Sequence, residues 1–180
     1  EEFAHLRLWS VLEDTRSFSS VANQYEYSLA SDVHVLFDAK YDTQPLVVID
    51  LHRWNNLRWD SDTTGDPTHI CMWGRKTRVY PYPSASASTT TINDVAGITA
   101  TATSITVAAT SAFQTQGRII IDSEVISYTG KTTTTLTGCT RGEEETTAAT
   151  HANAATITER DFIYHYQESP SDLIEETDET

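Results

Sequence analysis

Residues 89–158 read TTTINDVAGITATATSITVAATSAFQTQGRIIIDSEVISYTGKTTTTLTGCTRGEEETTAATHANAATIT, and this stretch decides how the chain is organised. It holds 21 Thr and 11 Ala in 70 residues, with two compact apolar runs among them. All four Trp and seven of the eight Tyr lie outside it. The change in composition, followed by a return to aromatic sequence, predicts one domain inserted into another.

Short β-strands are expected throughout the stretch, because a high Thr content favours extended backbone. The predicted strands are Ser104–Ala108, Arg118–Asp122, Glu124–Tyr128, Thr135–Cys139 and Ala155–Thr158. Turn signals separate them at Gln116-Gly117, Asp122-Ser123, Gly130-Lys131 and Arg141-Gly142. The pattern predicts a small β-sandwich-like or barrel-like module at residues 91–157.

The flanking sequence predicts a second β-rich domain, made of residues 1–90 plus 158–180. Apolar spacing favours a helix over Glu1–Asp14 and a short helix over Leu51–Trp59. The expected strands are Gln24–Leu29, Val33–Tyr41, Leu46–Ile49, Ile70–Trp73, Arg78–Tyr82 and Asp161–Gln167, with a turn at Asp42–Pro45. The fold class is therefore expected to be mainly β with a little α, an antiparallel β domain interrupted by the inserted module.

The charge of the chain argues against specific nucleic-acid recognition. The formal net charge is −14, whereas phosphate binding requires clustered Lys and Arg. Residues 159–180 carry eight acids and one base. No apolar run is long enough to span a bilayer, and no signal peptide is visible. The chain starts at Glu1 without Met and stops within an acidic run, so we expect it to be part of a longer protein.

One segment resembles the start of a calcium-binding loop. In Asp60–Asp66 the acids at loop positions one and three and Gly65 at position six fit the pattern. The twelfth position, which requires a bidentate Glu, is Cys71, and Pro67 stands at position eight. We therefore expect an acidic surface turn, and predict neither a metal nor a cofactor.

Cysteine and histidine offer no catalytic arrangement that the sequence singles out. Cys71 and Cys139 are the only cysteines, and we expect both to be free, small apolar side chains. His69 would share a strand face with Cys71, but a Cys–His pair also needs an orienting third group. We name no catalytic residue and do not expect an enzyme.

Aromatic and acidic side chains leave alternatives open. Trp54, Trp59 and Trp73 could stack on sugars, although their position among Leu and Ile favours core packing. A pair of carboxylates acting as acid and base is compatible with the composition, but no pair is marked out. Glu143–Glu145 is expected to form a solvated loop.

Three segments carry a resemblance to a known family. They are Gln24–Asp32; Gly65–His69 with Trp73-Gly74 and Arg78–Pro83; and Phe162–Gln167 with Ser169–Leu173. In this order they resemble segments of tailed-phage head–tail adaptor (connector) proteins. The resemblance implies a structural virion protein of the neck, a ring of copies between the portal and the tail proteins. It implies further that genomic DNA passes the ring without specific binding.

The inserted stretch resembles a module that recurs in phage virion proteins. The residues that carry this resemblance are Ile98–Val107, Ser127–Gly130 and Thr137–Gly142. They favour a virion setting without fixing which part of the virion. The alternative is therefore a tail or baseplate protein whose inserted module binds a carbohydrate or receptor. A hydrolase that uses carboxylates is a third hypothesis.

Overall fold

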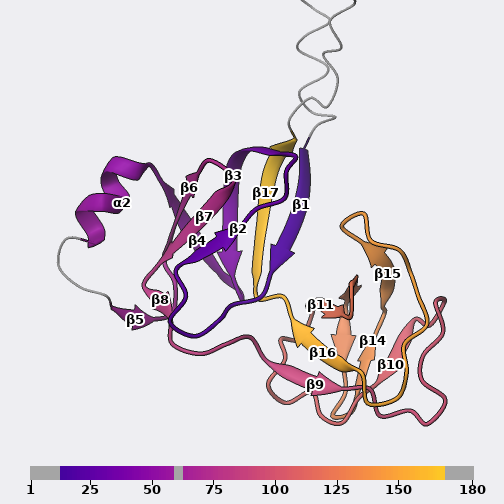
Figure 1. Ribbon diagram of the computed structural model, residues 1–180. Helices are drawn as coiled ribbons and strands as arrows, with labels where there is room; N and C mark the ends of the chain where they lie inside the picture. The colour runs from indigo at the N-terminus through magenta and orange to yellow at the C-terminus, as the bar shows by residue number, and fades with distance from the viewer. Residues whose placement is uncertain (1–12, 59–62, 169–180) are drawn as a thin grey trace, which may run out of the picture.

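The computed structural model describes residues 13–58 and 63–168 of the chain (Figure 1). The chain is mainly β, as the sequence predicts, with α2 (Leu51–Arg58) as its one described helix. Within these ranges no helix has the length and apolar character of a membrane span. Predicted residues 1–12 of the first helix lie outside the described part. Its last two, Glu13 and Asp14, belong to a strand instead.

A seven-stranded sheet brings together the two ends of the described chain. Its strands are β1 (Glu13–Phe18), β2 (Glu26–Ser28), β3 (Val33–Tyr41), β4 (Gln44–Ile49), β6 (His69–Trp73), β7 (Lys76–Tyr80) and β17 (Phe162–Glu168). Their order is β1-β17-β3-β4-β6-β7-β2. The last strand therefore lies between the first and the third, and it pairs antiparallel with both along its length.

The hairpin of β3 and β4 has a tighter turn than the predicted Asp42–Pro45. Asp42 adopts a φ of 52°, a left-handed conformation that Asp tolerates better than most residues. Pairing resumes at once, with Tyr41 opposite Gln44 and Pro45 already inside β4. Proline cannot donate a ladder hydrogen bond, and it is accommodated because β4 meets β6 only from Val47 onward.

Strands β4 and β6 pair parallel in a sheet that was predicted to be antiparallel, and helix α2 between them is the reason. The helix follows β4, so the chain returns to start β6 alongside β4 in the same direction. The predicted helix Leu51–Trp59 is confirmed over its described residues. Trp54 is fully buried and packs with Ile49 and Cys71 beneath the helix.

The main core of this domain lies on the face of the curled sheet opposite α2. Every second residue of β17 enters it: Phe162, Tyr164 and Tyr166. Phe18 of β1 stacks on Phe162 with ring centroids 4.5 Å apart and lies 4.6 Å from the ring of Tyr27. Aromatic residues from β1, β2 and β17 thus build much of this core.

The Thr-rich stretch forms a second group of sheets beside the first domain, at the right of Figure 1, and we call it the insert. Its strands are β9 (Thr89–Thr91), β10 (Ser104–Thr106), β11 (Gly117–Ile121), β12 (Glu124–Tyr128), β13 (Gly130–Lys131), β14 (Thr135–Thr137), β15 (Thr140–Glu143) and β16 (Thr156–Glu159). Their orders are β15-β12-β11-β16-β9 and β10-β14-β13. Two short strands outside it, β5 (Thr64–Gly65) and β8 (Tyr82–Pro83), pair parallel with each other.

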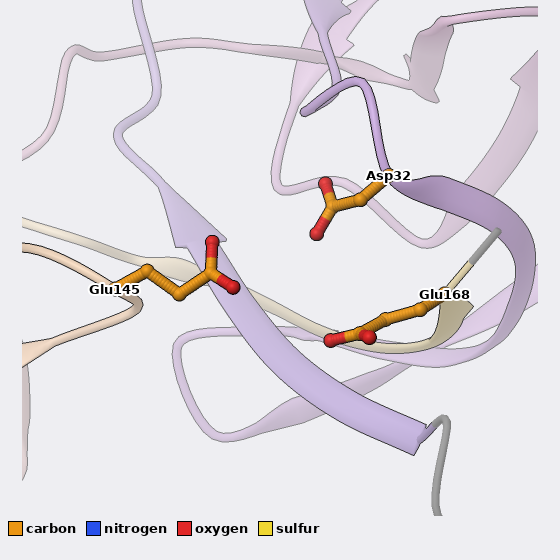
Figure 2. A group of neighbouring side chains, drawn as sticks. All are labelled: Asp32, Glu145 and Glu168. Atoms are coloured by element: carbon orange, nitrogen blue, oxygen red, sulfur yellow. The ribbon is translucent and has the colours of Figure 1, made fainter. Parts of the chain in front are cut away.

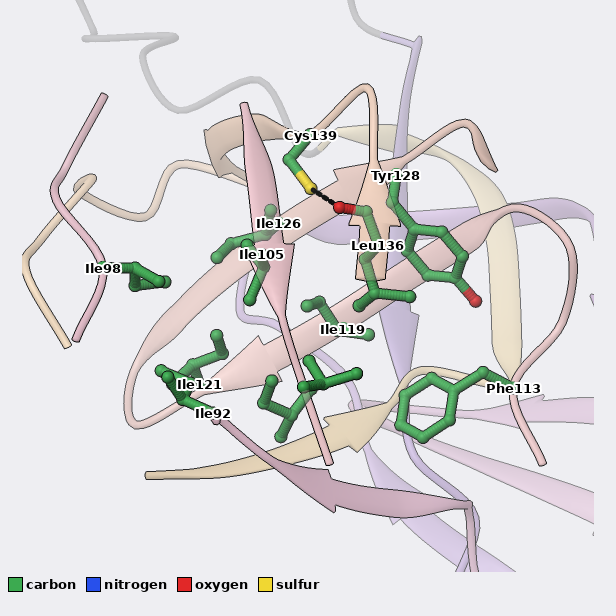
Figure 3. Packing of buried hydrophobic residues seen from close by; sticks show 12 residues of the cluster. Ile92, Ile98, Ile105, Phe113, Ile119, Ile121, Ile126, Tyr128, Leu136 and Cys139 are labelled. Atoms are coloured by element: carbon green, nitrogen blue, oxygen red, sulfur yellow. Dashed lines mark hydrogen bonds between the residues drawn. The ribbon is translucent and has the colours of Figure 1, made fainter. Parts of the chain in front are cut away.

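The insert has a hydrophobic core of its own (Figure 3). The fully buried aliphatic side chains come from both of its sheets: Ile105, Val107, Ile119, Ile121, Ile126, Leu136 and Ile157. Burying each such side chain stabilises a fold by about 1.5–3 kcal/mol. A few apolar positions per strand therefore suffice for a sheet pair that is otherwise rich in Thr.

Two predicted turns of the insert are strands in the structure. Gly130-Lys131 forms β13 and pairs with β14. Arg141-Gly142 lies within β15, where the register against β12 shifts between Val125 and Ser127. Gly142 has a φ of 68°, so this glycine serves an irregular strand and not a reverse turn. The predicted turn at Asp122-Ser123 is present between β11 and β12.

Candidate functional site

The junction between the seven-stranded sheet and the insert is the most elaborate polar site that the described residues form. Two connections run between the parts, residues 84–88 and residues 160–161. Ser20 holds the first connection, since its carbonyl oxygen accepts from the Ala87 amide at 3.0 Å. Ser19 holds the end of the insert, because its hydroxyl donates to the Glu159 carbonyl at 2.7 Å.

Asp161 fixes the second connection to the sheet. Its carboxylate accepts the Ser20 amide at 2.7 Å and the Ser20 hydroxyl. Its carbonyl oxygen accepts the Asp42 amide at 2.7 Å. Burial raises the pKa of both the Asp161 and the Asp42 carboxyl above the usual range. Hydrogen bonds from Ser20 and from the Asp42 amide thus hold this connection against the sheet.

A buried ion cluster joins β1 to the insert. Glu144 has a side chain only 5% exposed, and it accepts from Arg118 at 2.8 Å and from Arg160 at 3.4 Å. The Ser17 hydroxyl of β1 also donates to Glu144, and Arg160 Nε donates to Ser17 Oγ at 2.8 Å. Arg118 reaches the sheet directly, with Nη1 3.0 Å from the Thr15 carbonyl oxygen.

The prediction that Glu143–Glu145 forms a solvated loop is therefore wrong for Glu144. Glu144 and Glu145 have φ values of 54° and 61°, so the chain makes a sharp left-handed bend after β15. The bend turns the Glu144 carboxylate toward Arg118 and Arg160. Three consecutive acids look like a surface run in sequence, and only the fold shows that their cationic partners lie 26 and 16 residues away.

Arg16 of β1 extends this cluster along the sheet. It donates to Asp32 at 2.8 Å, to the Tyr166 hydroxyl at 2.8 Å, and to Glu145 of the insert. The Tyr166 hydroxyl donates in turn to Asp32 at 3.0 Å. Arg16 therefore contacts the start of β3, strand β17 and the insert with one guanidinium group.

Asp32, Glu145 and Glu168 come close enough to share a cation (Figure 2). One oxygen from each lies within 4.8 Å of the others. Arg16 already supplies a positive charge to Asp32 and Glu145, and Glu145 is largely exposed. The group is better described as part of the Arg16 ion network than as a metal site.

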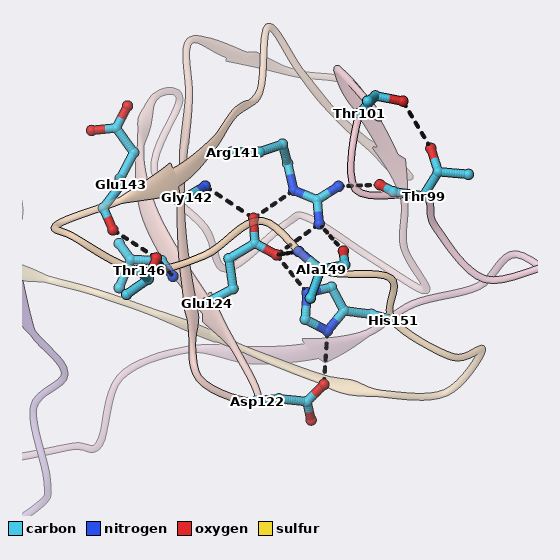
Figure 4. A network of polar contacts seen from close by, with 11 residues as sticks. Thr99, Thr101, Asp122, Glu124, Arg141, Gly142, Glu143, Thr146, Ala149 and His151 are labelled. Carbon is cyan, nitrogen blue, oxygen red and sulfur yellow. Dashed lines mark hydrogen bonds and ion pairs between the residues drawn. The ribbon is translucent and has the colours of Figure 1, made fainter.

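Inside the insert, Glu124 is the centre of a second buried network (Figure 4). Its carboxylate, 1% exposed, accepts from Arg141 at 2.7 and 2.8 Å and from the amides of Gly142 and Ala149. His151 Nε2 lies 2.8 Å from it. Burial alone would raise the pKa of Glu124, but the hydrogen bonds from Arg141, Ala149 and His151 outweigh burial and lower the pKa to about 2.

Glu159, at the other end of the insert, is a buried carboxylate whose pKa shifts in the opposite direction to that of Glu124. It accepts from the Gln114 amide at 2.7 Å and from the Tyr128 hydroxyl at 3.1 Å. No cation contacts its carboxylate in the part of the chain that the structure describes. Burial therefore raises the pKa of Glu159.

The calcium-like segment is only partly described. Asp60, Ser61 and Asp62 lie outside the described residues. Thr64 and Gly65 form β5, which pairs with β8. The predicted turn is therefore wrong at Thr64–Gly65, and it stays a prediction for Asp60–Asp62.

The two cysteines are buried free thiols, as predicted. Burial raises the pKa of Cys71, and it raises the pKa of Cys139 to about 11. A thiol is nucleophilic as its thiolate, so neither cysteine is poised to attack a substrate near neutral pH. His69 hydrogen-bonds through Nδ1 with the Thr68 hydroxyl at 2.9 Å.

The tryptophans divide between core and surface. Trp54 is buried, as predicted, whereas Trp73 is 46% exposed and the prediction of core packing is wrong for it. The Arg78 guanidinium covers one face of the Trp73 ring at 4.9 Å from the centroid. Trp73 is the last residue of β6, where the sheet ends, so no layer covers its side chain. Trp59 lies outside the described residues.

Four exposed apolar side chains lie on two neighbouring strands of the seven-stranded sheet. Phe37 is 48% exposed and Val47 is 51% exposed, and Val35 and Val48 are also exposed. All four belong to β3 and β4, the strands that separate after a short paired stretch. Val35 and Val48 line one hollow together, whereas Val47 is next to Val48 in β4 and points to the opposite face. We call Val35 and Val48 the β3/β4 apolar patch. Sequence reasoning missed the patch because alternation predicts which side chains share a face but not whether another layer covers that face.

Comparison with known proteins yields no relative: no protein-family model matches the chain, and neither a curated protein nor a solved structure matches it.

Proposed function

We propose that the chain is a structural subunit of a tailed-phage virion, a head–tail adaptor of the neck that forms a ring between portal and tail. The main support is the position in the fold of the three segments that resemble head–tail adaptor proteins. Gln24–Asp32 supplies β2, Arg78–Pro83 supplies part of β7 and all of β8, and Phe162–Gln167 supplies β17. Segments that are scattered in sequence thus meet in one domain, apart from the insert.

The β3/β4 apolar patch supports a role in an assembly. Apolar side chains that are exposed together on a single chain commonly mark a surface that a partner covers. The edge of β2, which borders the sheet on the side away from β1, is a further surface for pairing between copies. Strand β1, at the other border, is contacted by the insert. A ring would repeat one such contact head to tail.

The charge of the chain supports the proposed passage of DNA. A net charge of −14 repels the phosphate backbone, so a ring of such subunits would guide DNA without retaining it. The polar junction supports a fixed insert, because Ser17, Arg118, Glu144 and Arg160 bind its base to β1. The insert would then project at a constant angle from every subunit.

The second candidate is a tail or baseplate protein whose insert or exposed Trp binds a carbohydrate or receptor. Trp73 is the observation that favours it, since an exposed indole can stack on a sugar ring. Arg78 occupies one face of that indole and would compete with such stacking. Glycan binding that disappears in Trp73→Ala and persists in Trp54→Phe would favour this candidate.

The adaptor proposal is tested by charging the patch. Size-exclusion chromatography with light scattering would follow the full chain alone and mixed with a portal ring. Val35→Glu and Val48→Glu are expected to abolish assembly, whereas Val95→Glu, at a 96% exposed position of the insert, serves as the control. Assembly that survives both patch substitutions would contradict the proposal. So would an unmodified chain that stays monomeric both alone and in the presence of the portal ring.

A further inference from the structure

A slot opens in the seven-stranded sheet between β3 and β4. Strand β3 pairs with β17 from Val33 to Tyr41, but with β4 only from Ala39 to Tyr41. Strand β4 then turns to β6, with which it pairs from Val47. The resulting cavity of about 480 Å³ is lined by Val33, His34, Val35, Leu36, Val48, Ile49, Met72 and Gly74.

The slot has the chemistry of a strand-binding site. On the side that faces β4, Val33–Asp38 has no ladder partner among the described strands. Unpaired backbone groups on a strand edge accept an added strand, and the side chains beside the edge select which one. The walls here are Val, Leu, Ile and Met, so the expected occupant is an extended segment with apolar side chains.

The rim of the slot favours an acidic occupant. His34 lines the slot, and Arg75 follows Gly74 at its end. Within the described part of the chain neither side chain makes an ion pair. The nearby acid Asp32, by contrast, is bound to Arg16 and the Tyr166 hydroxyl. His34 and Arg75 are therefore the groups at this rim that can attract an acidic segment, and Glu168, opposite Val33, is the acid at the same end.

Residues 169–180 match these requirements in sequence and in position. They hold the apolar pair Leu173-Ile174, five acids and no base. They follow Glu168, which pairs with Val33 at the open end of the slot. We propose that segment 169–180 of one copy adds as a strand to β3 in the slot of the neighbouring copy. This inference rests on the ring proposed above.

The proposed ring and the length of the connecting residues favour the neighbouring copy over the same chain. Segment 169–180 leaves β17 on one side of β3, whereas the slot lies on the other side. The detour spans two strand spacings, about 10 Å. Ser169–Ser171 covers about this length only when fully extended, so the route within one chain leaves no slack, and Asp32 and Arg16 occupy this end of the sheet. A neighbour's segment meets no such limit, and each copy would both give and receive one strand.

Disulfide trapping tests the proposal on the full, assembled chain. Val35→Cys with Ile174→Cys, and independently Val48→Cys with Leu173→Cys, place thiols in the slot and on the segment. The native cysteines are buried and do not interfere. After mild oxidation, non-reducing gels are expected to show a ladder of linked copies. A third pair, Val48→Cys with Thr177→Cys, serves as the background for a control and is expected to give the ladder. Adding Leu173→Asp and Ile174→Asp to this pair is expected to abolish the ladder, because the segment loses its apolar side chains.

Other results would overturn the proposal. Cross-links found only within single chains would place the segment in its own slot. Cross-linking of Val35→Cys to Leu12→Cys, with none to Ile174→Cys, would assign the slot to residues 1–12. A ring seen by native mass spectrometry without any slot cross-link would reject this occupant and leave the adaptor function standing. A chain that forms no ring would reject the function itself.

Discussion

Arg118 of the insert donates a hydrogen bond from Nη1 to the carbonyl oxygen of Thr15 in the seven-stranded sheet, at 3.0 Å. The same nitrogen contacts Glu144 at 2.8 Å. One guanidinium group thus bridges a backbone atom of the first domain and a buried carboxylate of the insert. Relative movement of the two parts would break this contact, so we expect them to unfold as one unit.

Removing the Glu144 carboxylate should uncouple the two parts. Glu144→Ala leaves Arg118 and Arg160 without their buried partner, which typically costs about 3–5 kcal/mol. Scanning calorimetry should show a lower unfolding temperature and a single transition that separates into two. Glu143→Ala is the matched control, because the Glu143 carboxylate bonds Ser127 within the insert at 3.2 Å. Equal effects of the two substitutions would contradict the role assigned to Glu144.

The buried acids of the junction should make stability depend on pH. Burial raises the pKa values of Asp42, Glu159 and Asp161, so the folded chain binds protons that the unfolded chain has released. The free energy of unfolding should therefore fall as pH rises through the folded pKa values. Glu159→Gln keeps an acceptor oxygen but no charge. It should be more stable than the unmodified chain at pH 7 and lose that advantage near pH 4, as measured by urea unfolding.

Glu124 should act in the opposite direction at lower pH. Its pKa of about 2 lies below the ordinary value, so its contribution is present above the ordinary pKa and is lost as pH falls toward 2. Glu124→Ala leaves Arg141 and His151 buried without their partner, and unfolding should cost about 3–5 kcal/mol less. Glu26→Ala is the comparison: Glu26 also binds two cations, Lys76 and Arg78, but at the surface, where a small effect is expected.

Substituting Gly97 and Gly74 by Ala distinguishes the cost of backbone strain from the cost of a steric clash. Both have positive φ, 71° and 59°, which costs an Ala side chain about 1–2 kcal/mol. At Gly97 an added Cβ would also lie 2.3 Å from the His151 carbonyl oxygen, whereas at Gly74 nothing lies within 4 Å. Gly97→Ala should therefore destabilise by about 1–3 kcal/mol more than Gly74→Ala in chemical denaturation. Equal losses would show that the turn at Gly97 relaxes.

The sequence was sufficient for elements whose pattern is local. The β-branched and aromatic content of Val33–Tyr41 predicted β3, and the Thr-rich stretch's apolar run at Glu124–Tyr128 predicted β12, both with their observed bounds. The helical spacing of Leu51, Trp54 and Leu57 predicted α2. Strands without apolar alternation were missed. Thr89–Thr91 and Thr140–Glu143 are strands because β16 and β12 lie beside them, and no property of their own side chains indicates this.

The candidate site was harder to predict, because its partners are distant in sequence. Ser17 and Glu144 are 127 residues apart, and Arg16 and Tyr166 are 150 residues apart. A single sequence offers no signal for such pairs. Glu159 and Glu124 differ only in whether cations reach them, so their opposite pKa shifts also depend on the fold.

The central claim is that copies of this chain form a ring at the head–tail junction. Native mass spectrometry of the full-length protein, alone and with a portal ring, tests it most directly. The account predicts a discrete closed oligomer, or a fixed number of copies bound to each portal ring. A monomer that does not bind the portal would contradict the account.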